Sequence, residues 1–365
     1  MINKLVLENL RHRWVRTLLS ALVIGVQVMS ILTLIGLSRG MLRESAQRQK
    51  GTGADIFLKP DTGGTFSFSS GQIKEAFVSL VAKQPHVVQA VGVLSQPVEL
   101  VTTMNAVDIP KLEKLSGGIR LLQGRLPQQP DDLLVDQYYA RQNRIRVGQK
   151  VKLLNHDWTV CGIMQGGVLG RLIVQLRTLQ DLTSNPGRIS EILVKLDDPA
   201  RTNQEVSYFN DLLKGNLRAI SVEDFVSQFS IGNIPELKAF IGVITALSVV
   251  VGFLVVFLSM YTAVVERTRE IGILKALGAK PRTIIDILVR EALLLAVLGF
   301  AIGIGLAFAA KALITAVRPA SLQIVSVPDW WPNAALIAIA GALLGAIYPG
   351  LKAARQDAIE ALAYE

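Results

Sequence analysis

Cysteine and histidine are scarce in this 365-residue chain, and their scarcity narrows the chemistry it can perform. The only cysteine is Cys161, so an intramolecular disulfide and a cysteine-based metal site are excluded. The three histidines, His12, His86 and His156, lie far apart, and none has a second histidine or a cysteine at metal-ligand spacing. We therefore expect surface histidines, no metal site and no catalytic residue.

Motifs for phosphate binding and for hydrolysis are also missing. No Lys-Ser or Lys-Thr dipeptide occurs in the chain, although a Walker A loop needs that pair to reach phosphate and Mg²⁺. We therefore predict that the chain binds no cofactor and does not hydrolyse ATP through a P-loop. Residues 40–236 contain neither G-x-S-x-G nor H-E-x-x-H. Asp131 and Asp132, which follow Pro130, are interpreted as a solvated turn.

Charged residues make up only 18% of the chain, whereas half of its residues are hydrophobic. Soluble proteins usually carry about a quarter charged residues. Four runs contain no charge: 22 residues after Arg16, 27 after Lys238, 19 after Glu291 and 22 after Asp329. About 20 apolar residues cross a bilayer, so all four are predicted membrane spans. The first is too long for a signal peptide and lacks a cleavage site, which indicates an uncleaved anchor.

The net charge of +9 fits either a nucleic-acid binder or a membrane protein, and the placement of the basic residues favours the second. Basic residues are concentrated before the first run and between the second and third runs. We therefore predict an inner-membrane protein whose two termini face the cytoplasm. Trp330 and Trp331 are expected at the membrane interface, and Lys311 is expected to extend to the outer surface. Cys161 should then react with a thiol reagent from outside, while a cysteine at Ala276 should be protected.

The predicted fold class is membrane α-helical, with four transmembrane helices and a large mixed α/β extracytoplasmic domain between the first and second spans. The spans are predicted at 17–38, 238–265, 284–315 and 332–351. The remaining segments are an amphipathic N-terminal helix (1–16), the extracytoplasmic domain (39–237), a cytoplasmic coupling loop (266–283), a short outer loop (316–331) and a cytoplasmic tail (352–365).

Local patterns predict several elements inside the extracytoplasmic domain. Residues 55–60 read as a strand, and residues 71–83 as a helix with Ile73, Phe77, Leu80 and Val81 on one face. The stretch from 87 to 103 is typical of two strands broken by Pro97. Residues 150–164 predict a hairpin whose turn contains Asn155 and Asp157.

The segment after the second span combines a short amphipathic helix with strong punctuation. Gly278 and Pro281 predict that one helix ends and the next begins there, and Asp286 is four residues from Arg290, a spacing that allows an ion pair. A helix lying on the lipid surface and a helix that docks on a cytoplasmic partner explain the pattern equally well. In the spans, small-xxx-small pairs predict close helix packing, more within one subunit than between subunits; these pairs are Gly299 with Gly303 and Gly341 with Gly345.

Several stretches resemble the MacB/FtsX-type ABC transporter permeases. The sequence ERTREIGILKALGAK, at 266–280, is similar to the hallmark loop of that family. The opening ENLRHRWVRTLLSALVIGV, the stretch GRLPQQPDDLLVDQYYARQNRIRVGQKVKLLNHDWTVCGIM and the tail YPGLKAARQDAIEALAYE also resemble family segments. The tail departs from the family at Ala358, where proline is usual, and at Ala363, where arginine is usual.

The resemblance implies a permease subunit that carries no ATPase domain and pairs with a copy of itself or a paralogue. A separate cytoplasmic ABC ATPase, which binds ATP and Mg²⁺, would then drive movement of the extracytoplasmic domain, called mechanotransmission. The inserted part of that domain is expected at about 105–170. The implied contacts with the ATPase are Glu266, Arg269, Glu270, Lys275, Leu277 and Gly278.

Efflux of a substrate from the periplasm or the outer leaflet is the favoured function, with a periplasmic membrane-fusion protein and an outer-membrane channel as further partners. Membrane lipids are expected contacts, and nucleic acid is not. Two alternatives within the family stay open: an FtsX-like regulator of an envelope hydrolase and a permease for lipoprotein release. A membrane-anchored ligand sensor is disfavoured, because only about a dozen residues follow the fourth span.

Overall fold

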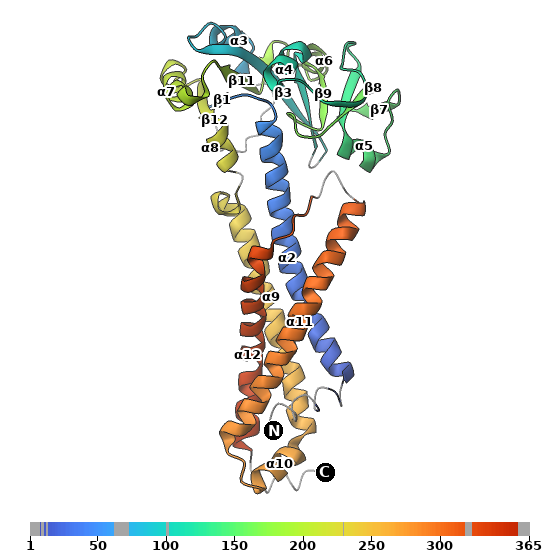
Figure 1. Ribbon diagram of the computed structural model, residues 1–365, viewed down its shortest axis with the longest axis vertical. Coiled ribbons are helices and arrows are strands. Elements are labelled where there is room, and N and C mark those ends of the chain that lie inside the picture. Colours follow the sequence, from blue (N-terminus) through green and yellow to red (C-terminus); the bar gives the residue numbers. More distant parts are fainter. Residues whose placement is uncertain are drawn as a thin grey trace. The chain divides into compact units, whose positions relative to one another are not determined.

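The computed structural model describes residues 8, 11, 14–61, 73–99, 102–228, 230–317 and 323–356, drawn as ribbons in Figure 1. They fall into two compact units. The helical unit comprises residues 1–39, 235–314 and 324–365, and the domain unit comprises residues 40–234 and 315–323, in each case as far as these are described. Most of the helix predicted at 1–16, and the tail positions Ala358 and Ala363, lie outside the described residues.

Four helices are long and apolar enough to cross a membrane, as predicted. They are α2 (Trp14–Lys50), α9 (Pro235–Glu266), α11 (Pro281–Val317) and α12 (Trp331–Arg355). Each extends beyond its predicted span, because backbone hydrogen bonding continues into the charged flanks where hydropathy changes. Large apolar side chains such as Phe240, Leu247 and Leu258 are exposed along α9, which is typical of a lipid-facing surface.

Glycines set the closest helix contacts in the helical unit. A Cβ atom at Gly299 would lie 2.6 Å from Ile24 of α2, and one at Gly303 would lie 2.6 Å from Val28 of α2. A Cβ at Gly345 of α12 would lie 2.8 Å from the Phe253 carbonyl oxygen of α9, whereas Gly341 leaves 3.8 Å to the same helix. Both glycine pairs therefore pack helices of one chain against each other.

The domain unit is built on a mixed ten-stranded sheet. Its strand order is β12-β1-β11-β3-β4-β9-β6-β8-β5, with β7 also paired to β8, and β4–β9 and β6–β8 are the parallel pairs. The strands are β1 (Ile56–Pro60), β3 (Val87–Glu99), β4 (Thr102–Val107), β5 (Leu121–Gly124), β6 (Asp132–Asp136), β7 (Lys150–Leu153), β8 (His156–Met164), β9 (Leu172–Gln175), β11 (Glu191–Leu196) and β12 (Leu217–Ser221). A separate pair joins β2 (Ile73–Lys74) and β10 (Arg188–Ile189).

Helices cover both faces of this sheet and bury two apolar layers. One layer contains Ile56 and Leu58 and is closed by α3 (Ala76–Val81), α5 (Gln137–Asn143), α6 (Leu176–Leu182) and α7 (Thr202–Leu212). The other contains Phe57 and is closed by α4 (Ile109–Ser116) and α8 (Val222–Ser227). Successive residues of β1 therefore enter opposite layers, as the two-residue period of a strand requires. Three short 3₁₀ turns, η1 (Pro199–Arg201), η2 (Ile231–Asn233) and η3 (Pro328–Trp330), complete the described elements.

Two of the local predictions in the domain unit are wrong in part. The helix expected at 71–83 begins only at Ala76, because Ile73 enters strand β2, and Leu80 is 43% exposed rather than packed. Strand β3 continues through Pro97 instead of breaking there. Its pairing with β11 ends at Val93, so Pro97 lies where β3 is paired with β4 alone and needs no amide donor on its free side.

The predicted strand at 55–60 and the predicted hairpin at 150–164 are present as β1 and as β7–β8. The hairpin turn consists of Leu154 (φ 52°) and Asn155 (φ 58°), and Asp157 belongs to strand β8. Two left-handed residues form the tight turn that matches the twist of paired strands.

Asp132 and Cys161 are buried, against the sequence-based expectations for both. Asp132 is 1% exposed, and Arg125 and the amides of Gln128 and Gln129 donate hydrogen bonds to its carboxylate. Burial alone would raise the pKa of Asp132, but the hydrogen bonds from Arg125, Gln129 and Gln128 hold it below the usual value. Cys161 is 5% exposed, and burial raises the pKa of its thiol to about 12, so this residue is poorly placed for the labelling expected of it.

A G-x-S-x-G pattern does occur at 36–40, but it lies inside helix α2. There the Ser38 hydroxyl donates to the Leu34 carbonyl at 2.9 Å, as in an ordinary helix. A hydrolase nucleophile needs a strained turn between a strand and a helix, so this serine is not one.

The last turns of α2 belong to the domain unit and are held there by buried charges. Arg171, 5% exposed, donates to both carboxylate oxygens of Glu44 at 2.7 and 2.9 Å, and Arg48 donates to the same carboxylate at 3.0 Å. Beside them, Asp136 caps α5 by accepting from the Tyr139 amide at 2.6 Å, and its own amide donates to the Arg171 carbonyl at 2.8 Å. Burial raises the pKa of Asp136 to about 6, although Arg171 and Arg48 act to lower it.

The raised pKa of Asp136 predicts a gain in stability as the pH falls. The folded protein binds this proton more tightly than the unfolded chain, so ionised Asp136 destabilises the fold above pH 6. That penalty decreases as the pH falls below 6 and is fully lost only below the unfolded pKa of about 4. Asp136→Asn keeps the cap acceptor and should remove about 1 kcal/mol of the stability difference between pH 7.5 and pH 5. The measurement is the unfolding free energy in detergent, with the exposed Asp181→Asn as control. If the unfolding free energies of Asp136→Asn and Asp181→Asn depended equally on pH, the assignment of a raised pKa to Asp136 would be contradicted.

The contact between α2 and α11 predicts that Gly303 tolerates no side chain. Gly303→Leu should lower the unfolding free energy by about 1–3 kcal/mol, because the new atoms overlap Val28 and the Gly25 carbonyl. Gly305→Leu, on the same helix with open space at its Cβ, is the matched control. Thermal unfolding in detergent would measure both. If the two variants lose the same stability, the close approach of α2 and α11 is wrong.

Candidate functional site

A short helix, α10 (Thr268–Ala276), joins the ends of two long helices, α9 and α11. The Thr268 hydroxyl donates to the Val264 and Val265 carbonyls and so satisfies the end of α9. After Leu277 the chain turns at Gly278 (φ 94°), where the Ala279 amide donates to the Leu274 carbonyl at 2.9 Å. Glycine fits this left-handed position best, and Pro281 begins α11, as the punctuation predicted.

Helix α10 is tied to its neighbours by two cations. The ammonium of Lys275 donates to the carbonyls of Ala354, at 2.7 Å, and Gln356, so it caps the end of α12. Arg267, just before α10, pairs with Glu291 of α11 at 3.5 Å, and Glu291 is 4% exposed. A movement of α10 would therefore displace α11 and α12 as well as α9, to which it is covalently joined.

A second set of contacts holds the same end of the bundle together. Glu266, the last residue of α9, forms an ion pair with Arg16 of α2. Lys352 of α12 donates to the Tyr261 hydroxyl at 3.0 Å and lies 4.7 Å from the centre of that ring. The predicted pair of Asp286 with Arg290 is present at 3.0 Å.

One face of α10 is left exposed by these contacts. Arg269 and Glu270 are exposed and form no ion pair within the described part of the chain, and Ile273 is 47% exposed. Leu277 is 80% exposed, an unusual placement for a large apolar side chain outside an apolar run. We call Arg269, Glu270, Ile273 and Leu277 the α10 face. A mixture of apolar and charged side chains at helical spacing is typical of a docking helix.

A hollow of about 300 Å³ lies between α9, α10 and α11, and Glu270 and Ile273 of the α10 face are among the residues that line it. Its walls are mostly apolar, with Val264, Ile271 and Leu288 among them, and the Arg267–Glu291 pair lies at its side. Close-packed interiors resist the movement of one helix against another. Because this position is not close-packed, α10 has room to shift against α11.

The residues predicted as the ATPase interface therefore separate into two groups. Arg269, Glu270, Leu277 and Gly278 are exposed on or next to α10, whereas Glu266 and Lys275 are engaged inside the chain by Arg16 and by α12. Sequence reasoning missed Ile273 and the Arg267–Glu291 pair. The available signal was the position of Glu291 directly before the third uncharged run, because a charge at the edge of a span is costly to bury unless it is paired.

Metal-ligating side chains do not gather anywhere in the part of the chain that the structure describes. Across the described ranges, no group of three or more His, Cys, Asp or Glu side chains could hold a metal ion. His86 and His156 lie in the domain unit, where they contact Asp197 at 3.1 Å and Asp131 at 2.9 Å.

Two family models match the chain. One is described as FtsX-like permease C-terminal and covers residues 242–358, and the other is described as MacB-like periplasmic core domain and covers residues 17–210. The second alone spans more than half of the chain.

Curated relatives extend the match over nearly the whole sequence. A protein named macrolide export ATP-binding/permease protein MacB, from Psychrobacter cryohalolentis, is 22% identical over 98% of this chain and 59% of its own length. The Neisseria meningitidis serogroup A protein of that name is 27% identical over 82% of this chain and 51% of its own length. The Bacillus subtilis ABC transporter permease YknZ is 28% identical over 60% of this chain and 55% of its own length. The chain thus spans between half and three fifths of these relatives.

Two solved structures match weakly. The periplasmic region of MacB from Actinobacillus actinomycetemcomitans covers 51% of this chain at 16% identity and a TM-score of 0.39. The extracellular domain of YknZ covers 46% at 13% identity and a TM-score of 0.35. The assignment rests on the family models. Their order along the chain agrees with the order of the α/β domain and the four apolar helices. The chain belongs to the MacB-like family of ABC transporter permeases, with an FtsX-like permease region and a MacB-like periplasmic core domain.

Proposed function

We propose that this chain is the permease subunit of an exporter and that a separate cytoplasmic ABC ATPase docks on the α10 face. The observation that carries the proposal is the α10 face itself: Glu270, Ile273 and Leu277 are exposed on a helix tied to α11 and α12 through Arg267 and Lys275. Force applied to α10 reaches the ends of three long helices. The absence of a Lys-Ser or Lys-Thr pair from the sequence supports ATP hydrolysis on another subunit.

Helix α2 provides a route from such a movement to the domain unit. Its residues up to Arg39 belong to the helical unit, and from Gly40 onward they belong to the domain unit, where Glu44 is bound by Arg171. At the opposite end of α2, Arg16 pairs with Glu266, next to α10. A continuous helix held at both ends can transmit a displacement, which supports mechanotransmission as the mechanism.

We further propose that movement of the domain unit drives efflux from the periplasm or the outer leaflet, together with a membrane-fusion protein and an outer-membrane channel. The names of the MacB relatives, which include macrolide export, support this direction of transport. The protein would act as a homodimer or with a paralogue, in the inner membrane.

Docking on the α10 face predicts that Glu270→Lys combined with Leu277→Asp abolishes co-purification with the co-expressed cognate ATPase. Charge reversal and loss of an exposed apolar anchor together should weaken binding at least tenfold. Glu236→Lys, at an exposed acid near the opposite end of α9, is the control and should bind normally. Lys275→Met should instead lower thermal stability, because it removes the cap from α12. Normal ATPase binding by the double variant would reject the α10 face.

The proposed orientation predicts which added cysteines a membrane-impermeant thiol reagent can reach in intact cells. In a Cys161→Ala background, Ser207→Cys on the exposed side of α7 should be labelled in spheroplasts, and Ala276→Cys on α10 only after the membrane is opened. Both positions are exposed, so burial does not explain a difference between them. Labelling of Ala276→Cys in sealed spheroplasts would overturn the proposed topology.

A further inference from the structure

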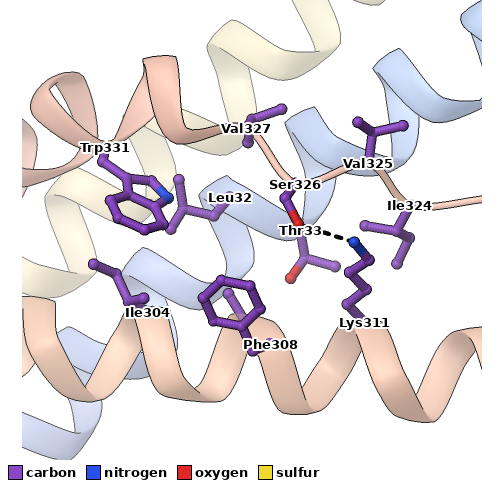
Figure 2. A pocket seen from close by; sticks show the side chains of 11 residues that line it. Leu32, Thr33, Ile304, Phe308, Lys311, Ile324, Val325, Ser326, Val327 and Trp331 are labelled. Atoms are coloured by element: carbon purple, nitrogen blue, oxygen red, sulfur yellow. Dashed lines mark hydrogen bonds between the residues drawn. The ribbon is translucent and has the colours of Figure 1, made fainter.

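A second hollow lies in the helical unit, among α2, α11 and the segment 324–327 that precedes η3. Figure 2 shows Phe308, Lys311, Ser326 and Trp331 around it, with Ile304 further along α11. The hollow contains about 350 Å³ of empty space, including its open mouth. Only about 30 Å³ of this space can be occupied by the centres of water molecules, which is room for about two or three of them. It can therefore hold part of a large molecule but not the whole of one.

The walls of this groove are fixed by specific contacts. The Val325 amide donates to the Gly36 carbonyl of α2 at 3.1 Å, and a Cβ atom at Gly36 would lie only 2.6 Å from the Val325 carbonyl oxygen. Next to it, Asp329 pairs with Arg39 at 2.6 Å. Glycine at position 36 thus allows the extended segment to lie directly on α2.

Two polar groups in the groove have unused hydrogen-bonding capacity. The Lys311 ammonium donates to the Ser326 hydroxyl at 2.9 Å, the dashed line in Figure 2, and has no acidic partner in the described ranges. An ammonium has three donors, so an anion can still bind it. The Thr33 hydroxyl is shielded from solvent and has no hydrogen-bond partner among the described residues. An unpaired hydroxyl of this kind is costly unless a ligand satisfies it.

The remaining walls are apolar. Phe308 and Trp331 meet edge to face with ring centres 6.4 Å apart, and Leu32 and Ile304 continue the surface along α2 and α11. Phe308 is 51% exposed, so this surface is open to the surroundings of the helices. The groove therefore combines a cationic end with an apolar side.

The position of the groove along the helices matches the boundary between headgroups and hydrocarbon. The uncharged run of α11 ends at Lys311, and Trp330 and Trp331 stand where α12 begins. Tryptophan and lysine side chains favour this level of a bilayer. A ligand entering from the side would meet the ammonium at headgroup depth and the apolar wall below it.

We propose that this groove binds an anionic phospholipid of the surrounding leaflet. The phosphate lies against Lys311 and accepts a hydrogen bond from Thr33, and the first carbons of one acyl chain lie along Phe308 and Ile304. The remainder of the lipid stays in the bilayer, as the volume of the groove requires. Lipid bound here fills the space between α2, α11 and the segment before η3, and so stabilises the end of the helical unit. This inference concerns binding alone and is independent of the ATPase.

Native mass spectrometry of the full chain in detergent tests the proposal with phosphatidylglycerol as the probe. The wild type should retain dioleoyl phosphatidylglycerol in preference to dioleoyl phosphatidylcholine. Lys311→Gln should weaken phosphatidylglycerol binding about tenfold, because a charge-assisted contact is lost, and Lys311→Arg should restore it. Lys238→Gln, at an exposed lysine of α9 outside the groove, is the matched control and should bind as the wild type.

Two further arms separate a lipid from other ligands. Thr33→Val, which preserves shape, should also weaken binding, so the result does not depend on Lys311 alone. Short-chain dihexanoyl phosphatidylglycerol should bind more weakly than the dioleoyl lipid, and inorganic phosphate alone should leave the melting temperature unchanged. The proposal would be overturned if inorganic phosphate raised the melting temperature as much as phosphatidylglycerol does. It would also be overturned if Lys311→Gln and Lys238→Gln weakened the binding of phosphatidylglycerol equally.

Discussion

The buried contact between Glu44 and Arg171 is the interaction on which the rest of this structure depends. The last turns of helix α2 follow its apolar run and are charged. Without the Glu44–Arg171 contact, no contact of comparable strength among the described residues would hold these turns. Because the carboxylate and the guanidinium are both less than a tenth exposed, breaking one partner would leave an uncompensated charge in the interior. Removing one member of such a pair typically costs about 3–5 kcal/mol. The pair therefore makes the last turns of α2 part of the domain unit, and burial at this site also raises the pKa of Asp136 beside it.

At the other end of α2 the same helix depends on backbone contact. Gly299 and Gly303 allow α11 to approach Ile24 and Val28 closely enough that a methyl group would not fit. Apolar attraction alone does not select helix partners within lipid, so such contacts decide which helices pair. In the mechanism proposed above, a tight helix contact and a buried ion pair along one element would keep α2 from absorbing a movement at either attachment.

The two hollows of the helical unit differ in what surrounds them. Space for the centres of water molecules is about 300 Å³ in the hollow beside α10 and about 30 Å³ in the groove near Lys311. The first is mostly apolar and bordered by the Arg267–Glu291 pair, whereas the second leaves a cation without an acidic partner among the described residues. In the first, the Arg267–Glu291 pair balances its own charge. The unbalanced cation in the second suits a ligand that brings its own negative charge.

Much of the fold could be predicted from local pattern, and the errors have physical causes. The four helices follow from uncharged runs, and the hairpin of β7 and β8 follows from its alternation and turn residues. Ile73 and Pro97 were misassigned because strand pairing, which no window of sequence contains, decided both. Glu266 and Lys275 were grouped with Arg269 and Glu270 because the family resemblance of the loop implied contacts along the whole segment. Only the positions of Arg16 and of the end of α12 separate them.

The sequence by itself determined that the chain has four membrane-spanning helices, an inserted α/β domain and a punctuated helix after the second span. Hydropathy, charge and turn chemistry act over neighbouring residues, so they can be read along the chain. Tertiary structure alone decided that Glu44 meets Arg171 across 127 positions, that Lys275 caps α12, and that Lys311 faces a groove beside Thr33. Burial and pairing between distant residues set the energy of a charge, and only the folded chain brings those residues together.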